Sequence, residues 1–132
     1  MNLKGYIFSR KYLDERTPQH VQNIVIREYC KKNNYNFLLS ATEYAFDNSF
    51  LMLKSVLDEI KKYDGVIAYS LFQLPEEEKN RINLLCKIVK LNKCFHFACE
   101  GMSVNSNKDI DIINDIWIVR SLLKMCPSEI NY

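Results

Sequence analysis

Short apolar runs alternate along the chain with longer segments whose apolar residues recur every three or four positions. The runs at 3–8, 35–39, 65–69 and 94–99 are largely apolar, which is typical of strands buried in a parallel sheet. The segments that follow them have the periodicity of helices. The resulting order βαβαβαβα predicts an α/β fold, with one doubly wound parallel sheet in a single domain that spans residues 1–132.

Local signals predict where the helices begin. Thr17 is expected to cap the first helix, Asp47 or Asn48 the second, and Pro75 to open the third. The fourth helix, 109–125, is apolar on more than one side and must bury more than one side. We expect it to pack across the sheet or to contact a second copy of the chain, making the protein a homo-oligomer. We also expect 102–108 to be a polar linker, and the first helix to bury the stripe formed by Val21, Ile24, Val25 and Tyr29.

Composition and charge exclude several classes of protein. The 132 residues are 48% hydrophobic and 12% aromatic, which is typical of one globular domain. The net charge of +2, with both signs mixed along the chain, argues against a strong electrostatic hold on nucleic acid. No apolar run approaches the ~20 residues of a membrane-spanning helix, and the N-terminus has no signal-peptide pattern. We therefore expect a cytoplasmic protein that is not inserted in a membrane.

The cysteines and glycines give no indication of a disulfide, metal or nucleotide motif. The number of cysteines is odd and none form a C-x-x-C pair, so we expect buried thiols in a reducing compartment. With three glycines the chain forms neither G-x-G-x-x-G nor a P-loop, and no Asp, Glu or His set has metal-ligand spacing. We expect no cofactor and no metal. The cysteines are Cys30, Cys86, Cys94, Cys99 and Cys126.

Polar residues follow each predicted strand. Because the carboxyl ends of parallel strands meet at one edge of a sheet, we expect these residues to converge there with the start of the first helix. The predicted catalytic candidates are Ser9, Glu43, Ser70 and Glu100. The predicted ligand-binding residues are Arg10, Arg16, Gln19, Asn23, Ser40 and Gln73. An alternative stays open, because strand ends are exposed and are often polar without any function.

Three stretches resemble the catalytic domain of serine recombinases, the resolvases and invertases. Residues 5–10 (GYIFSR) resemble its opening strand, 63–74 (YDGVIAYSLFQL) the strand that leads into its K-L-D-R-L motif, and 97–103 (FACEGMS) its E-G-I-S/D turn. The resemblance covers about residues 3–104. It implies a fold like the resolvase N-terminal domain, with the last helix in the position of the family's dimer helix.

The catalytic residues of that family are not preserved. In those enzymes a serine attacks a DNA phosphodiester and arginines stabilise the charge of the transition state. Here Arg10 holds the position of the serine, with Ser9 one residue early. The positions of the family's arginines and of its D-R pair are held by Phe8, Phe72-Gln73 and Glu76. The chain therefore resembles a degenerate recombinase domain, and we expect no recombinase activity.

A closer resemblance rests on five stretches taken together. GYIFSR, TPQHVQNIVIREYC, LSATEYA, YSLFQLP and HFACEG are similar to the bacterial sporadic carbohydrate cluster proteins. This resemblance implies a role in making surface polysaccharide or lipopolysaccharide sugars, but it implies no particular reaction. The residues that it marks largely coincide with the polar residues at the strand ends.

These observations lead to a preferred hypothesis and two alternatives. The preferred one is a cytoplasmic protein of surface-glycan biosynthesis that binds or modifies a sugar, sugar phosphate or nucleotide-sugar at the sheet edge. Arg10 and Arg16 are expected to meet phosphate or carboxylate, while Glu43 and Glu100 meet hydroxyls or move protons. The alternative is a non-catalytic dimeric scaffold or regulator of a biosynthetic enzyme. Nucleic-acid binding is the least favoured.

Overall fold

The computed structural model describes residues 1–12 and 16–125, and strands and helices alternate along it. The strands are β1 (Asn2–Ile7), β2 (Asn36–Thr42), β3 (Gly65–Ala68), β4 (Cys94–Phe97) and β5 (Met102–Val104). The helices are α1 (Gln19–Lys32), α2 (Leu51–Asp58), α3 (Glu78–Lys90) and α4 (Asn107–Met125), with short 3₁₀ turns η1 (Ile60–Lys62) and η2 (Leu71–Gln73). The strands form one sheet in the order β2-β1-β3-β4-β5.

The expected α/β class is confirmed, with one correction to the sheet. The pairs β1–β2, β1–β3 and β3–β4 are parallel, but β5 pairs with β4 in the antiparallel direction. The prediction of a polar linker over 102–108 was therefore wrong in its first three residues. Val104 is fully buried opposite Phe95, and Gly101, with φ of 64°, makes the tight reversal before β5. The fifth strand extends the sheet on the side of β4.

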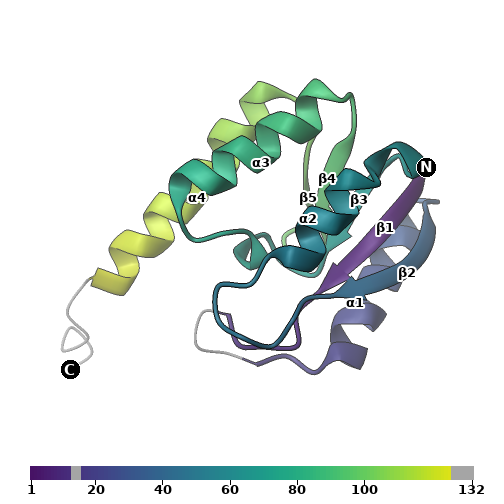
Figure 1. Cartoon of the computed structure of the whole chain (residues 1–132), viewed down its shortest axis with the longest axis horizontal. Helices are drawn as coiled ribbons and strands as arrows, with labels where there is room; N and C mark the ends of the chain where they lie inside the picture. Colours follow the sequence, from purple (N-terminus) through teal and green to yellow (C-terminus); the bar gives the residue numbers. More distant parts are fainter. Residues whose placement is uncertain (13–15, 126–132) are drawn as a thin grey trace.

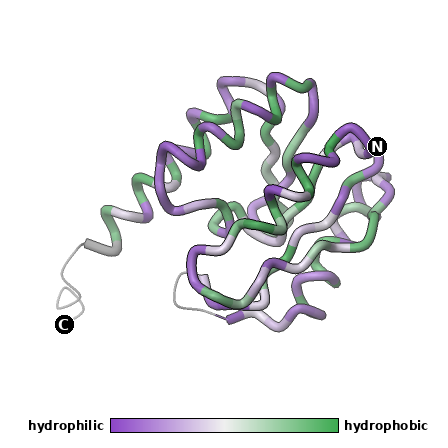
Figure 2. The backbone as a smooth tube through the Cα atoms, viewed as in Figure 1, coloured by the Kyte–Doolittle hydropathy of each residue, from purple (hydrophilic) through white to green (hydrophobic). Residues whose placement is uncertain are grey.

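Helices cover both faces of the sheet (Figure 1). On one face α1 packs over a small core that includes Leu3, Ile7 and Ile67. On the other face α2, α3 and α4 cover a larger core that includes Tyr6, Val66 and Phe95. Successive residues of each strand thus point to opposite layers, as a pleated strand with helices on both sides requires. Figure 2 shows hydrophobic (green) and hydrophilic (purple) residues alternating along the helices, as expected for helices that bury one side.

The buried stripe of α1 differs from the predicted one. Gln22, Ile26 and Cys30 are its buried residues, whereas Ile24 is 56% exposed. The prediction considered only apolar residues and therefore missed a buried stripe whose first residue is Gln22. Gln22 is accommodated because all of its polar side-chain atoms are hydrogen-bonded, as described below.

The predicted caps of α1 and α2 were also wrong, and α3 begins at Glu78 rather than at Pro75. Pro18 holds the cap position of α1, and Thr17 caps no N–H of that helix. At α2 the cap position is Phe50, which has no side-chain acceptor, and neither Asp47 nor Asn48 caps the helix. The N–H groups of its first turn are satisfied instead by Glu43, a residue that follows β2.

The last helix extends beyond the body of the molecule (Figure 1). Its first half packs against α3 and β5, and the Trp117 indole N–H donates to the Leu71 carbonyl at 3.3 Å. Its second half leaves large apolar side chains exposed, among them Val119, Leu122 and Leu123. α4 therefore buries one side against its own chain and leaves apolar surface uncovered.

Two of the cysteine predictions were wrong. Cys30 and Cys94 are buried as expected, but Cys86 and Cys99 are exposed, and Cys126 lies outside the described residues. Cys86 lies on the outer side of α3 and Cys99 in the turn after β4. Both side chains are exposed there, although the residue that precedes each in sequence is apolar and buried or partly buried. Within residues 1–12 and 16–125, no cluster of three His, Cys, Asp or Glu is placed to hold a metal ion. No helix of the described chain has the length and apolar character needed to cross a membrane.

Candidate functional site

Polar side chains from four strand ends meet at the edge where β1, β2, β3 and β4 terminate. Their loops are held together by backbone hydrogen bonds that continue the sheet, such as Glu43 N–H to Ile7 and Cys99 N–H to Tyr69. The predicted candidates form two groups, one after β1 and β2 and the other after β3 and β4. Convergence at this edge follows from the parallel arrangement of the strands.

Glu43 is the centre of the first group and is buried. Its carboxylate accepts hydrogen bonds from the Tyr6 hydroxyl at 2.8 Å, the Ser49 hydroxyl at 3.0 Å and the backbone N–H of Tyr44 at 3.0 Å. The N–H groups of Met52 and Leu53, in the first turn of α2, complete the set at 3.2 Å each. The carboxylate thus serves as the N-terminal cap of α2.

These hydrogen bonds determine the protonation of the pair Tyr6 and Glu43. Burial by itself raises the pKa of Glu43, but the hydrogen bonds that its carboxylate accepts, that of the Met52 N–H foremost, outweigh burial and hold this pKa below its ordinary value. Burial, followed by the adjacent Glu43 charge, raises the pKa of Tyr6 far above its ordinary value. Glu43 is therefore an ionised acceptor beside a neutral phenol, which is the arrangement of a structural carboxylate.

Ser9 and Arg10 lie beside this carboxylate group. The Ser9 hydroxyl donates to the backbone carbonyl of Glu43 at 2.8 Å. One guanidinium nitrogen of Arg10 donates to the Tyr44 carbonyl at 3.2 Å, and its guanidinium carbon lies 4.2 Å from the centre of the Phe8 ring. Only 8% of Arg10 is exposed, yet no carboxylate of the described residues lies within 4.0 Å of it. Arg10 is thus a nearly buried cation without a described counter-ion.

The second group forms around the η2 turn. The Ser70 hydroxyl accepts the Phe72 N–H at 3.2 Å and donates to the Glu100 carboxylate at 2.8 Å. Glu100 also accepts the Leu71 N–H at 2.9 Å, and Gln73 accepts the Ser70 N–H at 3.3 Å. Ser70 and Gln73 thereby form a capping box, and Glu100 adds a second acceptor for the same turn.

Gln22 joins the two groups; it was not among the predicted site residues, although the resemblance to the sporadic carbohydrate cluster proteins marks it. Its amide accepts the Phe8 N–H at 3.0 Å and donates to the Phe8 carbonyl at 2.9 Å, which completes the backbone bonding of β1 as it ends. The Gln73 amide donates to Gln22 at 2.9 Å. A glutamine in register with Ile26 and Cys30 was the available signal, because a polar residue on a buried helical stripe needs buried partners.

Four predicted ligand-binding residues lie apart from this arrangement: Ser40, Asn23, Arg16 and Gln19. Ser40 is inside β2, where its hydroxyl donates to Asn23 at 2.7 Å beneath α1. Arg16 and Gln19 are exposed before and at the start of α1, and neither lines the pocket described next. Of the predicted residues, the structure brings together Ser9 with Glu43 and Arg10, Ser70 with Gln73 and Glu100, and, away from this edge, Ser40 with Asn23.

A pocket of about 250 Å³ opens at this edge; we call it the rim pocket. Arg10 is the one predicted candidate that lines it. The pocket adds a second cation, Lys11, two carboxylates and several aromatic rings that the site prediction did not include. Its lining residues are Phe8, Arg10, Lys11, Tyr12, Asp47, Asn48, Phe50, Phe72, Leu74 and Glu76.

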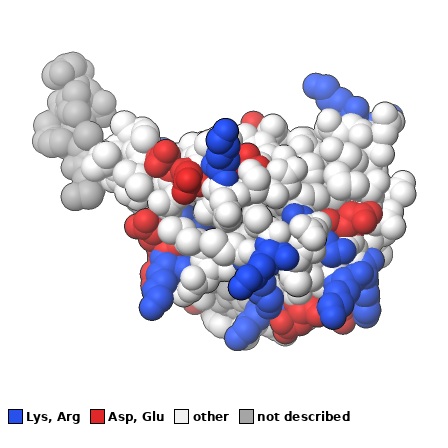
Figure 3. All heavy atoms as spheres, turned by 90° about the horizontal axis from the view of Figure 1, so that it is seen from above, with Lys and Arg blue, Asp and Glu red and all other residues white. Residues whose placement is uncertain are grey.

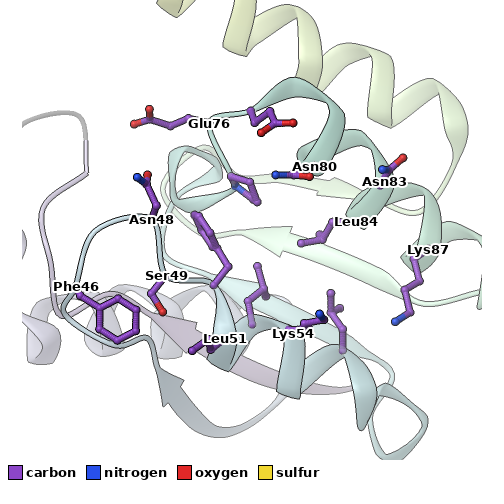
Figure 4. Close-up of a pocket in the computed structure, with 15 residues that line it drawn as sticks. Phe46, Asn48, Ser49, Leu51, Lys54, Glu76, Asn80, Asn83, Leu84 and Lys87 are labelled. Carbon is purple, nitrogen blue, oxygen red and sulfur yellow. The ribbon is translucent and has the colours of Figure 1, made fainter.

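A larger groove of about 730 Å³ lies between α2 and α3, and we call it the α2–α3 groove (Figure 4). Asn48, Phe50 and Glu76 line both the groove and the rim pocket, so the two hollows adjoin. The groove is lined by Phe46, Asn48, Ser49, Phe50, Leu51, Leu53, Lys54, Leu57, Pro75, Glu76, Glu77, Asn80, Asn83, Leu84 and Lys87.

Comparison with known proteins identifies the fold of the chain. No protein-family model and no curated protein sequence gives a significant match, so the resemblance to the sporadic carbohydrate cluster proteins stays a prediction. Among solved structures, the N-terminal catalytic domain of TP901-1 integrase has a TM-score of 0.66 at 15% identity, over 98% of this chain and 99% of that chain. A resolvase family site-specific recombinase from Streptococcus pneumoniae has a TM-score of 0.64 at 12% identity, over 93% of this chain and 91% of that chain. The chain has the fold of a serine recombinase catalytic domain, as its sequence motifs predicted.

Proposed function

We propose that this protein binds a sugar carrying an anionic group, as a sugar phosphate or nucleotide-sugar does, in the rim pocket and that it is not a recombinase. The observation that carries the proposal is Arg10, a nearly buried cation that lines the pocket without a described carboxylate partner. Buried charges are normally paired, because leaving water is costly for an unpaired ion. A phosphate or carboxylate of a ligand is the counter-ion that suits this position.

The residues around Arg10 hold its guanidinium group in position to bind such a ligand. The Phe8 and Phe50 ring centres lie 4.2 and 5.0 Å from the guanidinium carbon, which stabilises the cation and holds its planar group in place. One nitrogen is held by the Tyr44 carbonyl. A guanidinium has five N–H donors in a fixed fork, so donors remain for a bidentate contact with phosphate. Lys11 lines the same pocket and adds a second positive charge.

The rest of the lining suits a polyhydroxyl group. Asp47, Glu76 and Asn48 provide oxygen acceptors for hydroxyls, and the Asn48 amide also donates. The rings of Tyr12 and Phe72 provide apolar faces for the C–H groups of a sugar. Arginine, carboxylates and aromatic faces in one small pocket together favour an anionic sugar over a simple inorganic ion.

The same pocket argues against recombination. Four of the five positions at which the sequence resemblance implies catalytic residues line it: Phe8, Arg10, Phe72 and Glu76, but not Gln73. Where phosphoryl transfer on DNA calls for a serine and several cations, these four positions supply one cation and one carboxylate. The charges on the face seen in Figure 3 are also of mixed sign, without the continuous basic surface typical of DNA binding.

The geometry supports binding better than turnover. Of the four catalytic candidates, Glu43 caps α2, Ser9 donates to a backbone carbonyl, and Ser70 and Glu100 satisfy each other and the η2 turn. None of the four lines the rim pocket. We therefore propose a binding protein of surface polysaccharide or lipopolysaccharide biosynthesis that acts in the cytoplasm. The pathway and the location rest on the sequence resemblance and on the expectations from composition.

The test is ligand binding by calorimetry and thermal shift, with UDP-glucose, α-glucosyl phosphate and glucose as probes. The phosphorylated probes are expected to raise the melting temperature, and Arg10→Met to weaken their binding by about tenfold or more, since hydrogen bonds to charged groups contribute about 1.5–3 kcal/mol. Arg10→Lys keeps the charge and is expected to retain part of the affinity.

Arg27→Met is the matched control. Arg27 is exposed on α1, and its guanidinium carbon lies 5.5 Å from the centre of the Phe37 ring, so it shares the aromatic contact but lines neither hollow. If none of the phosphorylated probes raises the melting temperature, or if Arg10→Met and Arg27→Met weaken binding equally, the proposal is refuted.

A second candidate function, a dimeric scaffold, is favoured by the exposed apolar side of α4. Leu122 and Leu123 are 57% and 60% exposed near the end of a helix that leaves the body of the molecule. We propose that a second copy of the chain covers them. Light scattering is then expected to give the mass of a dimer, and Leu122→Glu with Leu123→Glu the mass of a monomer. A monomer for the unchanged chain at about 100 μM, well above the Kd of a stable dimer, refutes this function.

A further inference from the structure

The α2–α3 groove begins where the rim pocket ends. Asn48, Phe50 and Glu76 belong to both linings, so a ligand anchored at Arg10 has the groove as its direct continuation. Figure 4 shows the groove between the two helices, with Phe46 and Asn48 at one end and Lys54 and Lys87 towards the other. The two hollows therefore present one elongated binding surface with two compartments.

The sizes of the compartments assign different parts of a ligand to them. Pockets that hold a drug-sized ligand usually measure ~300–1,000 Å³. At about 250 Å³ the rim pocket is smaller than this range, while the groove at about 730 Å³ lies well inside it. The rim pocket thus has room for a sugar phosphate, and the groove for a larger body attached to it.

The groove combines an apolar floor with amide groups at its margin. Its floor includes Leu53, Leu57 and Leu84, contributed by α2 and α3. Asn80 and Asn83 lie three residues apart on α3, hence on one face of the helix, and both border the groove in Figure 4. Neither side chain forms a hydrogen bond to another described residue, so their donors and acceptors face solvent.

This chemistry favours a nucleobase over the other bodies of similar size. A base has flat apolar faces that suit a leucine floor, and its edge carries donors and acceptors that an asparagine amide matches in pairs. A hydrocarbon chain would leave Asn80 and Asn83 without partners. A second sugar would bring hydroxyls to the floor, where Leu53, Leu57 and Leu84 offer no acceptor.

An aromatic platform at the open end of the groove adds to this preference. Phe46 lines the groove, is 59% exposed and stacks on Tyr44, with ring centres 5.7 Å apart and an interplanar angle of 13°. Stacking of a base on exposed aromatic rings contributes ~1–3 kcal/mol per base in nucleic-acid-binding proteins. Two parallel rings beside an apolar slot are suited to a planar heterocycle.

We infer that the α2–α3 groove is a nucleoside subsite and that the ligand class of this protein is the nucleoside-diphosphate sugar. The inference rests on the proposed function, because it takes Arg10 and Lys11 as the phosphate-binding residues of the rim pocket. The base occupies the groove against Leu57 and Leu84, with its edge towards Asn80 and Asn83. The diphosphate passes Asn48 into the rim pocket.

Calorimetry with matched probes tests the subsite. UDP-glucose, dTDP-glucose and GDP-mannose contain the nucleoside, and α-glucosyl phosphate lacks it. At least one of the nucleotide-sugars is expected to bind about tenfold or more tightly than α-glucosyl phosphate. Asn80→Ala combined with Asn83→Ala is expected to remove most of that advantage and to leave the binding of α-glucosyl phosphate unchanged. Asn105→Ala is the control, since Asn105 is exposed and lines neither hollow.

The failures of the subsite and of the proposed function give different results. If α-glucosyl phosphate binds through Arg10 but no nucleotide-sugar binds better, the subsite is refuted and the proposed function stands. If uridine alone binds and is sensitive to Asn80 and Asn83 while no phosphorylated probe depends on Arg10, the subsite stands and the proposed function fails. Tighter binding of farnesyl phosphate than of every nucleotide-sugar assigns the groove to a hydrocarbon chain and refutes the inference. Because both asparagines are exposed, their variants are expected to unfold at the temperature of the unchanged chain.

Discussion

Replacing Glu43 with alanine tests the conclusion that this carboxylate is structural. The change removes an acceptor shared by five donors, of which three are buried: the Tyr6 hydroxyl, the Ser49 hydroxyl and the Leu53 N–H. Loss of a helix cap costs about 1 kcal/mol, and each buried donor left without a partner costs about 1–3 kcal/mol. We expect the free energy of unfolding of Glu43→Ala to fall by about 3–5 kcal/mol, a large part of the ~5–15 kcal/mol of a typical domain.

Urea unfolding followed by circular dichroism measures this change. The slope of the free energy against urea should stay the same, because the same surface is exposed on unfolding. Glu59→Ala is the control: Glu59 is exposed and pairs with Lys62 at 3.5 Å, so its loss should change stability by less than about 0.5 kcal/mol. A loss below about 1 kcal/mol for Glu43→Ala, with an unchanged slope, refutes the capping role.

The pH dependence provides a second test of Glu43. Because folding lowers its pKa, the stability that Glu43 contributes is complete above its unfolded pKa, near 4.5, and is lost as the pH falls through the lower folded value. The Glu43→Gln variant cannot titrate at this position. The difference in free energy of unfolding between the unchanged chain and Glu43→Gln should therefore shrink as the pH falls below about 4.5. A difference that stays constant or grows with acid contradicts the lowered pKa.

Three further substitutions test the packing around the site. Gly5→Ala should destabilise the fold by about 1–3 kcal/mol in urea unfolding, because the new Cβ overlaps the Ser40 side chain and lies 3.0 Å from its Cα; a neutral result contradicts this close approach. Gln22→Leu should cost about 2–4 kcal/mol by leaving its buried partners, including Gln73, unsatisfied, and hydrogen exchange at the end of β1 should accelerate. Trp117→Ala should cost about 3–5 kcal/mol and release α4, so that a protease cleaves within 107–125 faster than in the unchanged chain; equal cleavage contradicts the anchoring role.

Much of the sheet was predictable because three of its strands are short and largely apolar. β1, β3 and β4 are buried on both faces, which gives a signal within four to six residues of sequence. β5 gives no such signal, since three residues are too few to show a period and their pairing with β4 depends on the turn at Gly101. The bulge between β1 and β2 was not predictable either. Lys4 and Tyr6 of β1 are two residues apart, but their partners in β2 are three residues apart. Gly5 lies at this bulge, where its lack of a Cβ leaves room for Ser40.

The site was predictable as a neighbourhood but not as a set of contacts. The rule that parallel strands end at one edge correctly brought Ser9 near Glu43 and Ser70 near Glu100. Whether Glu43 faces a ligand or a helix depends on where the first turn of α2 docks, and that is set by tertiary packing. The same packing buries Arg10 between Phe8 and Phe50, which come from different loops. These arrangements depend on residues that are far apart in the chain, so local sequence patterns do not predict them.

The contact between Phe72 and Trp117 has a consequence for regulation. Phe72 lines the rim pocket and meets the Trp117 ring edge-on, with centres 5.3 Å apart, so one aromatic pair connects the pocket to the helix whose far end carries exposed leucines. A ligand that repositions Phe72 must alter the anchorage of that helix. The two binding events are then linked: a partner that docks on the helix changes the ligand affinity of the pocket by the same factor by which the ligand changes the affinity for that partner. Ligand binding in the rim pocket and docking on α4, if both occur as proposed, would therefore be thermodynamically coupled.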